Sequence, residues 1–302
     1  MNLSLNQFEV LVYIEREQDK KHTQRGLSKV LDLSLGVVNK TLTELQELEL
    51  LKVQENGLFT VTLKGYEWLE PHRVRKAVFL AAGFGSRLVP ITLNTPKPLI
   101  LVHGKRIIDS LLDAVLEAGI EDITIVRGYL GEQFDCLLNK YPMIKFIENQ
   151  SYNEANNISS AYLIKDIMAN AYVLESDLLL YNPKVIRKYE YSSNYLGMKV
   201  DRTDDWCFFT KRGYIHKMSV GGENCHHMFG ISYWNKEDAK TMSVDIEKVF
   251  KMPGGKERYW DEVALRECID HYKIMVKPVH KEDIVEIDTF SELKEIDSIY
   301  NI

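Results

Sequence analysis

The chain has 302 residues, of which 45% are hydrophobic and 27% are charged, and its formal net charge is -6 at pH 7. This length exceeds the usual size of a single domain, so we expect two domains. No apolar run approaches the roughly 18 residues that cross a bilayer, and we therefore expect no membrane span. The negative net charge gives the chain as a whole no attraction for nucleic acid.

The first residues, 1–17, lack the basic region, apolar block and small-residue cleavage site of a signal peptide. We therefore expect a cytoplasmic protein.

The four cysteines are scattered and never form a CxxC pair, which argues against a disulfide scaffold or a zinc knuckle. Cys225-His226-His227 could bind a metal. A structural zinc site needs about four ligands, however, and the sequence shows no second cluster that would supply the others.

The N-terminal part combines three helical patterns with a hairpin. Apolar residues recur at helical spacing over residues 5–16, 27–31 and 37–51, and Ser34 is placed to cap the third helix. Two alternating segments, 51–54 and 58–62, then flank Glu55-Asn56-Gly57. Asn-Gly between such segments predicts a β-hairpin.

This succession resembles the winged helix-turn-helix of MarR-like regulators over residues 1–70. The resemblance implies that the third helix reads DNA through Asn39, Lys40 and Thr43, but glutamates flank these residues at positions 44, 47 and 49. A helix that faces phosphates would normally be more basic. DNA binding therefore stands beside two alternatives, an intrachain role and a dimerisation role that would give a homodimer.

The second domain reads as an α/β fold. Residues 71–75 form a linker, and a buried strand follows at 76–80. Further strands are expected at 123–127, 145–148, 171–175, 195–200, 207–210 and 228–234. Helical patterns at 108–118 and 159–167 alternate with the early strands, which predicts a doubly wound mixed sheet over residues 76–302.

A glycine-rich turn follows the first strand of this domain directly, in the order Leu80-Ala81-Ala82-Gly83-Phe84-Gly85-Ser86-Arg87-Leu88. Small residues let backbone amides approach a polyphosphate, and consecutive amides bind anions. Arg87 and Lys97 could neutralise phosphate charge. The turn lacks the third glycine of a dinucleotide fingerprint, and the chain has no GK[ST] motif.

This turn, followed by Thr95-Pro96-Lys97-Pro98-Leu99, resembles the signature of the nucleotidyltransferases that make nucleotide sugars and CDP-alcohols. The resemblance runs from residue 76 almost to the C-terminus. It implies catalytic roles for Arg87 and Lys97, with Lys97 touching phosphate at the reacting centre. It also implies a nucleotide-binding loop made of Ala82, Gly83, Gly85 and Ser86.

Two acidic positions complete the family pattern. Asp177 ends the segment Val173-Leu174-Glu175-Ser176-Asp177, and Asp288 ends Val285-Glu286-Ile287-Asp288. By resemblance these two aspartates bind Mg²⁺. That cation prefers oxygen ligands and commonly takes one or two carboxylates together with substrate phosphates and water.

Within the family, segments 128–135, 156–163, 230–234 and 259–261 resemble bacterial LicC-type CTP:phosphocholine cytidylyltransferases. The implied reaction joins CTP and phosphocholine into CDP-choline and releases pyrophosphate. The added winged helix and residues 225–227 depart from that pattern. Uncertain alignment over 211–217 leaves any second phosphate-binding lysine unassigned.

A quaternary ammonium cannot donate hydrogen bonds and is bound by aromatic faces, so large aromatics are candidate ligands. We predict that the substrate contacts Tyr162, Trp206, Tyr233 and Trp260, with Asp261 or Asp205 as counter-charge. The alternative is that these aromatic side chains simply fill the core.

Other functions remain open. Phosphoethanolamine or 2-aminoethylphosphonate could replace phosphocholine, because both keep a cationic head group. A sugar-1-phosphate nucleotidyltransferase is disfavoured by the aromatic residues at 206 and 260. A nucleotide-sensing, DNA-binding regulator would explain the winged helix, but the retained basic and acidic site residues argue against lost chemistry.

Overall fold

The computed structural model describes residues 3–18, 20–54 and 57–301. The chain divides into two compact units. The first comprises Met1–Arg73 together with Tyr189–Tyr191, and the second comprises Val74–Lys188 and Ser192–Ile302. Among the described residues, no helix combines the length and apolar character that crossing a bilayer requires.

The first unit has the predicted helices and hairpin. In chain order its elements are α1 (Leu5–Arg16), α2 (Gln24–Val30), α3 (Leu35–Glu47), β1 (Leu51–Val53), β2 (Phe59–Val61) and α4 (Leu63–Leu69). Ser34 caps α3 as predicted, since its side chain accepts a hydrogen bond from the amide of Val37. The helix ends before the predicted residue 51, because Glu49 has a φ of 61° and Leu51 already pairs in the hairpin. Glu55 and Asn56 of the predicted turn lie outside the described residues.

A segment from far along the chain completes the core of this first unit. Tyr189 and Tyr191 join the cluster built on Phe8 and the other buried residues of the three helices. The Tyr191 ring stacks on His72 at 5.5 Å, and its hydroxyl donates a hydrogen bond to the carbonyl of Leu3. The winged-helix unit is therefore discontinuous in sequence.

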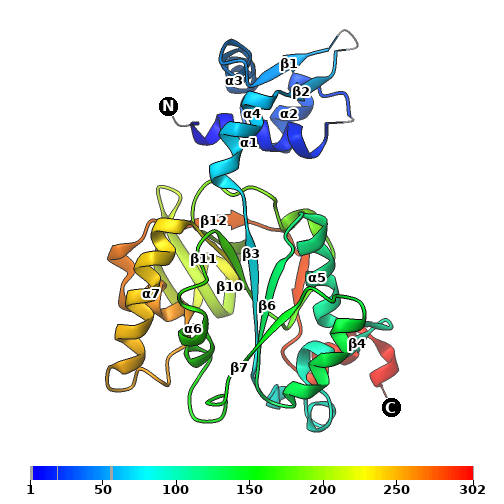
Figure 1. Ribbon diagram of the computed structural model, residues 1–302, viewed down its shortest axis with the longest axis vertical. Coiled ribbons are helices and arrows are strands. Elements are labelled where there is room, and N and C mark those ends of the chain that lie inside the picture. Colours follow the sequence, from blue (N-terminus) through cyan, green and yellow to red (C-terminus); the bar gives the residue numbers. More distant parts are fainter. Residues whose placement is uncertain (1–2, 19, 55–56, 302) are drawn as a thin grey trace. The chain divides into compact units, whose positions relative to one another are not determined.

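The second unit is built on a seven-stranded mixed sheet in the order β10-β12-β11-β8-β3-β6-β7 (Figure 1). The strands are β3 (Lys76–Ala81), β6 (Asp122–Arg127), β7 (Lys145–Glu148), β8 (Ala171–Glu175), β10 (Asn194–Lys211), β11 (Tyr214–Trp234) and β12 (Met275–Pro278). β3 pairs in parallel with β6 and β8, whereas β11 runs antiparallel to β8. This confirms the predicted fold class. Two small pairs accompany the sheet, β4 (Leu101–Val102) with β5 (Lys105–Arg106) and β9 (Leu178–Leu180) with β13 (Ile284–Glu286).

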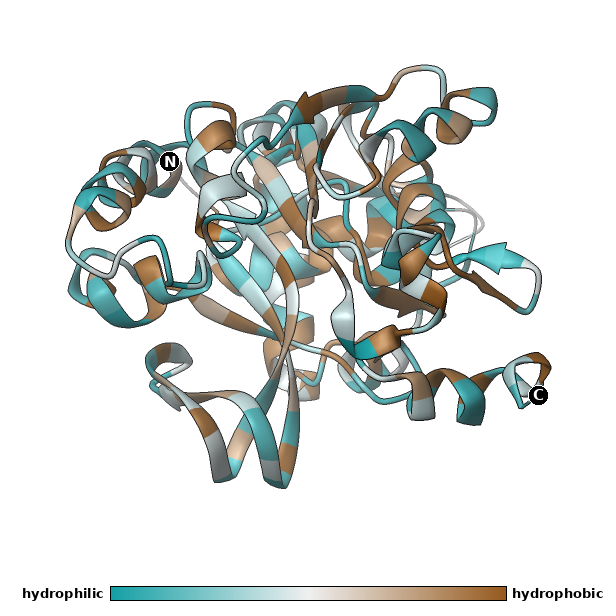
Figure 2. Ribbon diagram, turned by 90° about the horizontal axis from the view of Figure 1, so that it is seen from below, coloured by the Kyte–Doolittle hydropathy of each residue, from teal (hydrophilic) through white to brown (hydrophobic). Residues whose placement is uncertain are grey.

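Helices cover both faces of this sheet (Figure 1). α5 (Ile107–Glu117) packs on one face, α6 (Ile158–Ile164) and α7 (Lys236–Lys251) pack on the other, and α8 (Phe290–Ile296) lies near the C-terminus. Side chains alternate along a strand, so Phe79 of β3 enters the core beneath α5 while Val78 enters the core beneath α6 and α7. Figure 2 shows the amphipathic pattern that this burial requires, with hydrophobic and hydrophilic stretches succeeding each other along the helices.

β10 and β11 form a long antiparallel ribbon, for which the sequence pattern predicted only shorter, separate strands. The predicted strands 195–200 and 207–210 both belong to β10, and the predicted strand 228–234 is only the end of β11. The strands turn at Arg212-Gly213, where both residues have positive φ as a two-residue hairpin turn demands. The pairing register shifts between Thr203 and Trp206, which displaces the side chains there from regular alternation.

We expect a chain that begins at Val74 to fold but to self-associate. Removal of the winged-helix core would expose Tyr189, which is only 2% exposed in the full chain, and Tyr191. Exposed aromatic surface promotes association. Size-exclusion chromatography and circular dichroism would measure both properties.

Replacing Tyr189 and Tyr191 with serine should restore a single monodisperse species to the truncated chain. The same replacements in the full chain serve as control and should lower its thermal stability. A truncated chain that is monodisperse without them would contradict the expectation.

Candidate active site

The glycine-rich turn leaves the carboxyl end of β3 and is shaped by two tight packing contacts. Gly85 has a φ of 62°, and a Cβ added there would lie 3.0 Å from Cβ of Lys97 and 3.1 Å from Cγ2 of Thr92. The Thr92 hydroxyl donates a 2.9 Å hydrogen bond to the Gly85 carbonyl. A Cβ added at Gly83 would meet only open space, so the backbone at Gly83 is open to a ligand. This geometry suits a loop whose amides bind phosphate.

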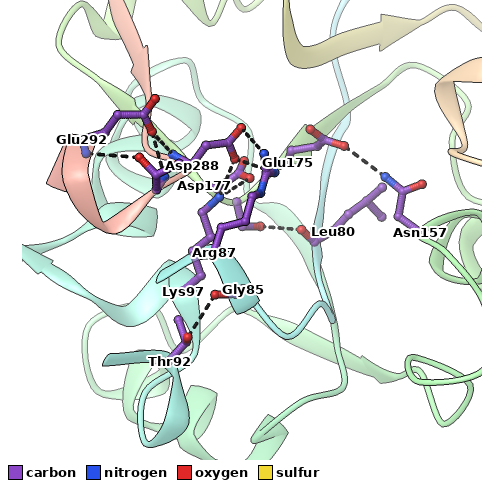
Figure 3. Close-up of polar contacts among 12 residues, drawn as sticks. Leu80, Gly85, Arg87, Thr92, Lys97, Asn157, Glu175, Asp177, Asp288 and Glu292 are labelled. Atoms are coloured by element: carbon purple, nitrogen blue, oxygen red, sulfur yellow. Dashed lines mark hydrogen bonds and ion pairs between the residues drawn. The ribbon is translucent and has the colours of Figure 1, made fainter. Parts of the chain in front are cut away.

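Lys97 lies at the centre of the site, between two carboxylates (Figure 3). Its ammonium donates to Oδ2 of Asp177 at 2.9 Å and to Oδ1 of Asp288 at 3.0 Å. Arg87 donates to Oδ2 of Asp288 at 2.9 Å. Burial alone would lower the pKa of Lys97, but the two carboxylates outweigh it and raise that pKa above its ordinary value. The lysine therefore stays charged.

Asp177 and Asp288 are each positioned by hydrogen bonds of residues close to them in sequence. Asp177 follows β8, where the hydroxyl of Ser176 donates to the Leu80 carbonyl and ties the end of β8 to β3. Asp288 precedes α8, and the Glu292 carboxylate accepts the amides of Asp288 and Thr289 in a capping box. Sequence-distant segments thus deliver two carboxylates to one lysine.

The residues present fit a bound magnesium ion. Oδ1 of Asp177 is buried and has no hydrogen-bond partner among the described residues, while Oδ2 of the same carboxylate faces Lys97. An unsatisfied buried carboxylate oxygen is costly unless a cation compensates it. Asp177 and Asp288 would supply the oxygen ligands that Mg²⁺ prefers.

These groups line one cleft of about 590 Å³. The predicted site residues in its wall are Ala82, Gly83, Gly85, Ser86, Arg87, Lys97, Asp177, Trp206, Asp261 and Asp288. Carboxylates that the sequence did not single out join them, namely Glu175 and Glu286.

Family models match both parts of the chain. The Nucleotidyl transferase model matches residues 76–194, and the MarR family model matches residues 1–58. A 2-aminoethylphosphonate cytidylyltransferase of Lancefieldella rimae is 35% identical over 74% of this chain and 92% of its own length. The chain belongs to the nucleotidyl transferase family.

The chain is also similar to a protein of Streptococcus pneumoniae, both in sequence and in structure. A choline-phosphate cytidylyltransferase of Streptococcus pneumoniae is 32% identical over 74% of this chain and 97% of its own length. The solved structure of CTP:phosphocholine cytidylyltransferase (LicC) from Streptococcus pneumoniae superposes with a TM-score of 0.70 at 32% identity, over 75% of this chain and 99% of the other. The similarity thus spans the whole nucleotidyltransferase unit.

Only one of the four predicted aromatic ligands reaches the cleft of this nucleotidyltransferase. Trp206 lines it and meets the ring of Tyr259 edge-on at 5.7 Å. Tyr259 also lines the cleft and was not among the predicted ligands. The backbone amide of Trp260 donates to Asn157, but the indole is 1% exposed and packs on Tyr195. The predicted pairing of indoles from Trp206 and Trp260 around a cation is therefore not formed.

The two predicted tyrosines also lie outside the cleft lining. Tyr162 stacks on Phe250 at 4.6 Å, between α6 and α7. Tyr233 belongs to the core on the α5 side of the sheet, where its ring meets Tyr172. The structure supports the core alternative for these two rings, because sheet packing turns them away from the site.

Glu175 and Glu286 are the functional candidates that sequence reasoning missed. Each stands two residues before a predicted metal ligand, in Glu175-Ser176-Asp177 and Glu286-Ile287-Asp288. Burial, followed by neighbouring carboxylates that include Asp177, raises the pKa of both glutamates well above the usual range. The repeated Glu-x-Asp pattern at two strand ends was the available signal.

Glu175 and the buried Asp261 each accept a hydrogen bond, and Asp261 helps to raise the pKa of Glu175. Asn157 donates to Glu175 at 3.1 Å, and the Tyr195 hydroxyl donates to Asp261 at 2.9 Å. A Cβ at Gly230 would lie 2.3 Å from the Glu175 carboxylate, so Gly230 leaves room for that group. Burial raises the pKa of Asp261 to about 7, despite the hydrogen bond from Tyr195.

The Cys225-His226-His227 cluster divides between core and site. Cys225 is buried beside Cys207. His227, in contrast, lies within 4.8 Å of carboxylate oxygens from Asp205 and Glu286. Asp205 and Glu286 lie far from this cluster along the chain, so their proximity to His227 could not be recognised from the sequence.

We expect Asp261→Asn to raise thermal stability at pH 8 but not at pH 4.5. The pKa of Asp261 is raised from 3.8 to about 7 in the folded chain, so between these values only the unfolded chain loses the proton. Stability therefore falls as pH rises through that window, and the amide removes this loss. Thermal unfolding across pH 4.5–8 measures the change in stability, since the melting temperature shifts by roughly 2–4 °C for each kcal/mol.

Asp270→Asn, at an exposed position, is the matched control and should leave the pH dependence unchanged. Parallel curves of melting temperature against pH for the wild type and Asp261→Asn would contradict the assignment of this proton.

Proposed function

We propose that this enzyme transfers the cytidylyl group of CTP to a small phosphorylated amine in the cytoplasm, with Mg²⁺ as cofactor. The single observation that carries the proposal is the placement of Lys97 between Asp177 and Asp288 beside the glycine-rich loop. The relatives support the choice of nucleotide, because the enzymes of Lancefieldella rimae and Streptococcus pneumoniae, which match across this unit, are both named cytidylyltransferases.

The loop and the basic residues define where the nucleotide binds. Backbone amides around Gly83 would hold the triphosphate, and Arg87 would offset its charge. Mg²⁺, held by Asp177 and Asp288, would supply charge neutralisation and orientation of the triphosphate. Lys97 would stabilise the charge that develops on the α-phosphate, since its ammonium is already fixed at that position by two hydrogen bonds.

The reaction is an in-line displacement. An oxygen of the substrate phosphate forms a bond to the α-phosphorus of CTP, the bond from that phosphorus to the bridging oxygen breaks, and pyrophosphate leaves with the electron pair. An ionised phosphate is an adequate nucleophile, so no general base is assigned. Positioning within the cleft and charge neutralisation supply the catalysis.

The chemistry of the cleft wall favours a cationic head group over a sugar. Carboxylates of Asp205, Asp261 and Glu286 line the cleft together with the indole of Trp206. A cationic head group favours the ionised form of these carboxyl groups and is attracted by the aromatic face. Phosphocholine, phosphoethanolamine and 2-aminoethylphosphonate all satisfy this requirement, and a sugar 1-phosphate does not.

The test of the proposal is pyrophosphate release with the four common nucleoside triphosphates and these three amines. We expect activity with CTP to exceed activity with UTP, GTP or ATP, and to require Mg²⁺. Absence of transfer from CTP to any of the amines would refute the function.

We expect Asp177→Asn to reduce turnover by at least about 100-fold, because the metal-bound triphosphate loses a charged ligand at the reacting phosphorus. The matched control is Asp122→Asn. Asp122 also forms an ion pair with a lysine at 2.9 Å, but this partner is the exposed Lys145 at the far edge of the sheet. If Asp177→Asn keeps more than a tenth of wild-type turnover at saturating Mg²⁺, the metal assignment is wrong.

Lys97→Met should lower kcat by about 10²–10³-fold, the usual effect of removing one donor to a developing charge. The KM for CTP should change less, because the lysine acts on the reacting phosphate. Lys145→Met is the control and should leave both constants unchanged. A raised KM with an unchanged kcat would make Lys97 a ground-state binding residue instead.

A further inference from the structure

Three hydrogen-bond acceptors from three strands of the second unit gather beside the cleft. One carboxylate oxygen of Asp205, one of Glu286 and one ring nitrogen of His227 all lie within 4.8 Å of one another. Asp205 and His227 belong to the β10–β11 ribbon, and Glu286 ends β13. We call these three groups the acceptor tripod.

The hydroxyl of Thr203 contacts the ring of one ribbon member of the tripod and the backbone of the other. Its Oγ1 lies 3.2 Å from Nδ1 of His227 and accepts the backbone amide of Asp205, also at 3.2 Å. In the part of the chain that the structure describes, Nε2 of His227 has no hydrogen-bond partner. Burial lowers the pKa of His227 and thereby favours the neutral ring, which carries a lone pair.

The tripod is placed at the right depth for a short substrate. Asp205 and Glu286 line the same cleft as the phosphate-binding loop. Glu286 also lies within 4.8 Å of Asp177, which stands at the reacting centre. A two-carbon link separates an amine nitrogen from its phosphorus by about 4 Å in a phosphonate and about 5 Å in a phosphate ester, since single bonds are about 1.5 Å long. A head group in the tripod would thus leave its phosphorus on the side of Asp177, the carboxylate that accepts from Lys97.

The arrangement is compatible with a primary ammonium group, because no two of the tripod atoms are more than 4.8 Å apart. Its N–H···O bonds are about 2.9 Å long and point to corners of a tetrahedron, so three acceptors on one ammonium stand about 4.7 Å apart. We infer that Asp205, His227 and Glu286 bind the –NH₃⁺ group of the acceptor substrate, which makes that substrate a two-carbon primary amine bearing a phosphate or phosphonate. This inference rests on the proposed function and specifies its second substrate.

A trimethylammonium group fits the tripod less well. It has no N–H to donate, so it could use the charge of the two carboxylates but not the lone pair of a neutral His227. Trp206 and Tyr259 offer it aromatic faces, yet the indole of Trp260 that would complete an enclosure lies in the core. His227 is therefore the residue that discriminates between the two kinds of amine.

The experiment measures steady-state kinetics with CTP and four acceptors: 2-aminoethylphosphonate, phosphoethanolamine, phosphocholine and amine-free ethyl phosphate. The wild type should use a primary amine at least about 10-fold more efficiently than phosphocholine. Asp205→Asn and His227→Leu should each raise the KM for the primary amines by about 10- to 100-fold, the value of a hydrogen bond to a charged group, and leave the KM for CTP unchanged. Glu286 stays intact, because its substitution would also disturb Asp177.

Substitution of His227 by leucine should leave the KM for phosphocholine unchanged, whereas His227→Gln should rescue the primary amines in part, since its side-chain oxygen is an acceptor. Matched controls are His226→Leu, on the same strand, and Asp204→Asn, whose side chain is 90% exposed. Both should keep wild-type constants. Circular dichroism confirms that each variant is folded.

Four results would overturn the inference. A wild type that prefers phosphocholine refutes it and leaves the proposed function standing, whereas no transfer from CTP to any acceptor refutes both. Equal losses for phosphocholine and the primary amines in His227→Leu would make the residue structural. The fourth result comes from titration with Mn²⁺ alone. We expect the wild type and His227→Leu to bind Mn²⁺ equally, and loss of a bound ion in the variant would make the tripod a metal site.

Discussion

The shared ion pair of Lys97 with Asp177 and Asp288 is the interaction on which the rest of the site depends. Lys97 is only 8% exposed, and removing a partner from such a buried charge typically costs about 3–5 kcal/mol. The pair joins a turn after β3, the end of β8 and the start of α8. Because Gly85 packs directly on the side chain of Lys97, the same lysine also fixes the conformation of the phosphate-binding loop.

The cleft holds more carboxyl groups than cationic side chains, and this imbalance constrains what can bind. Its carboxyl groups belong to Glu175, Asp177, Asp205, Asp261, Glu286 and Asp288, whereas its cationic side chains are Lys97 and Arg87. Crowded carboxyl groups disfavour one another's ionisation unless cations join them. A triphosphate alone would increase that repulsion. A divalent ion and an acceptor with a cationic head group together relieve it, so the charge pattern disfavours an acceptor whose phosphate is attached to an uncharged sugar.

Local signals in the sequence predicted the centre of this site, and global packing determined the rest. The glycine loop and the strand ends that carry Asp177 and Asp288 are contiguous motifs, so their chemistry could be inferred without the fold. Whether Trp260 and Tyr233 face the cleft or the core depends on how the sheet and helices pack, which residue type does not reveal. The ribbon was predicted as fragments because its half-exposed polar residues break the alternation expected of a buried strand.

The chemistry of transfer and the recognition of the acceptor reside on different elements. Lys97, Asp177 and Asp288 are anchored at the edge of the sheet and beside α8. Asp205, Trp206 and His227 come from the β10–β11 ribbon, and the first two lie at the register shift between Thr203 and Trp206. A change of side chain on the ribbon can therefore alter which amine is accepted without moving the groups that act on the triphosphate. The relatives, named for 2-aminoethylphosphonate and for choline phosphate, match over the same unit, as this separation would permit.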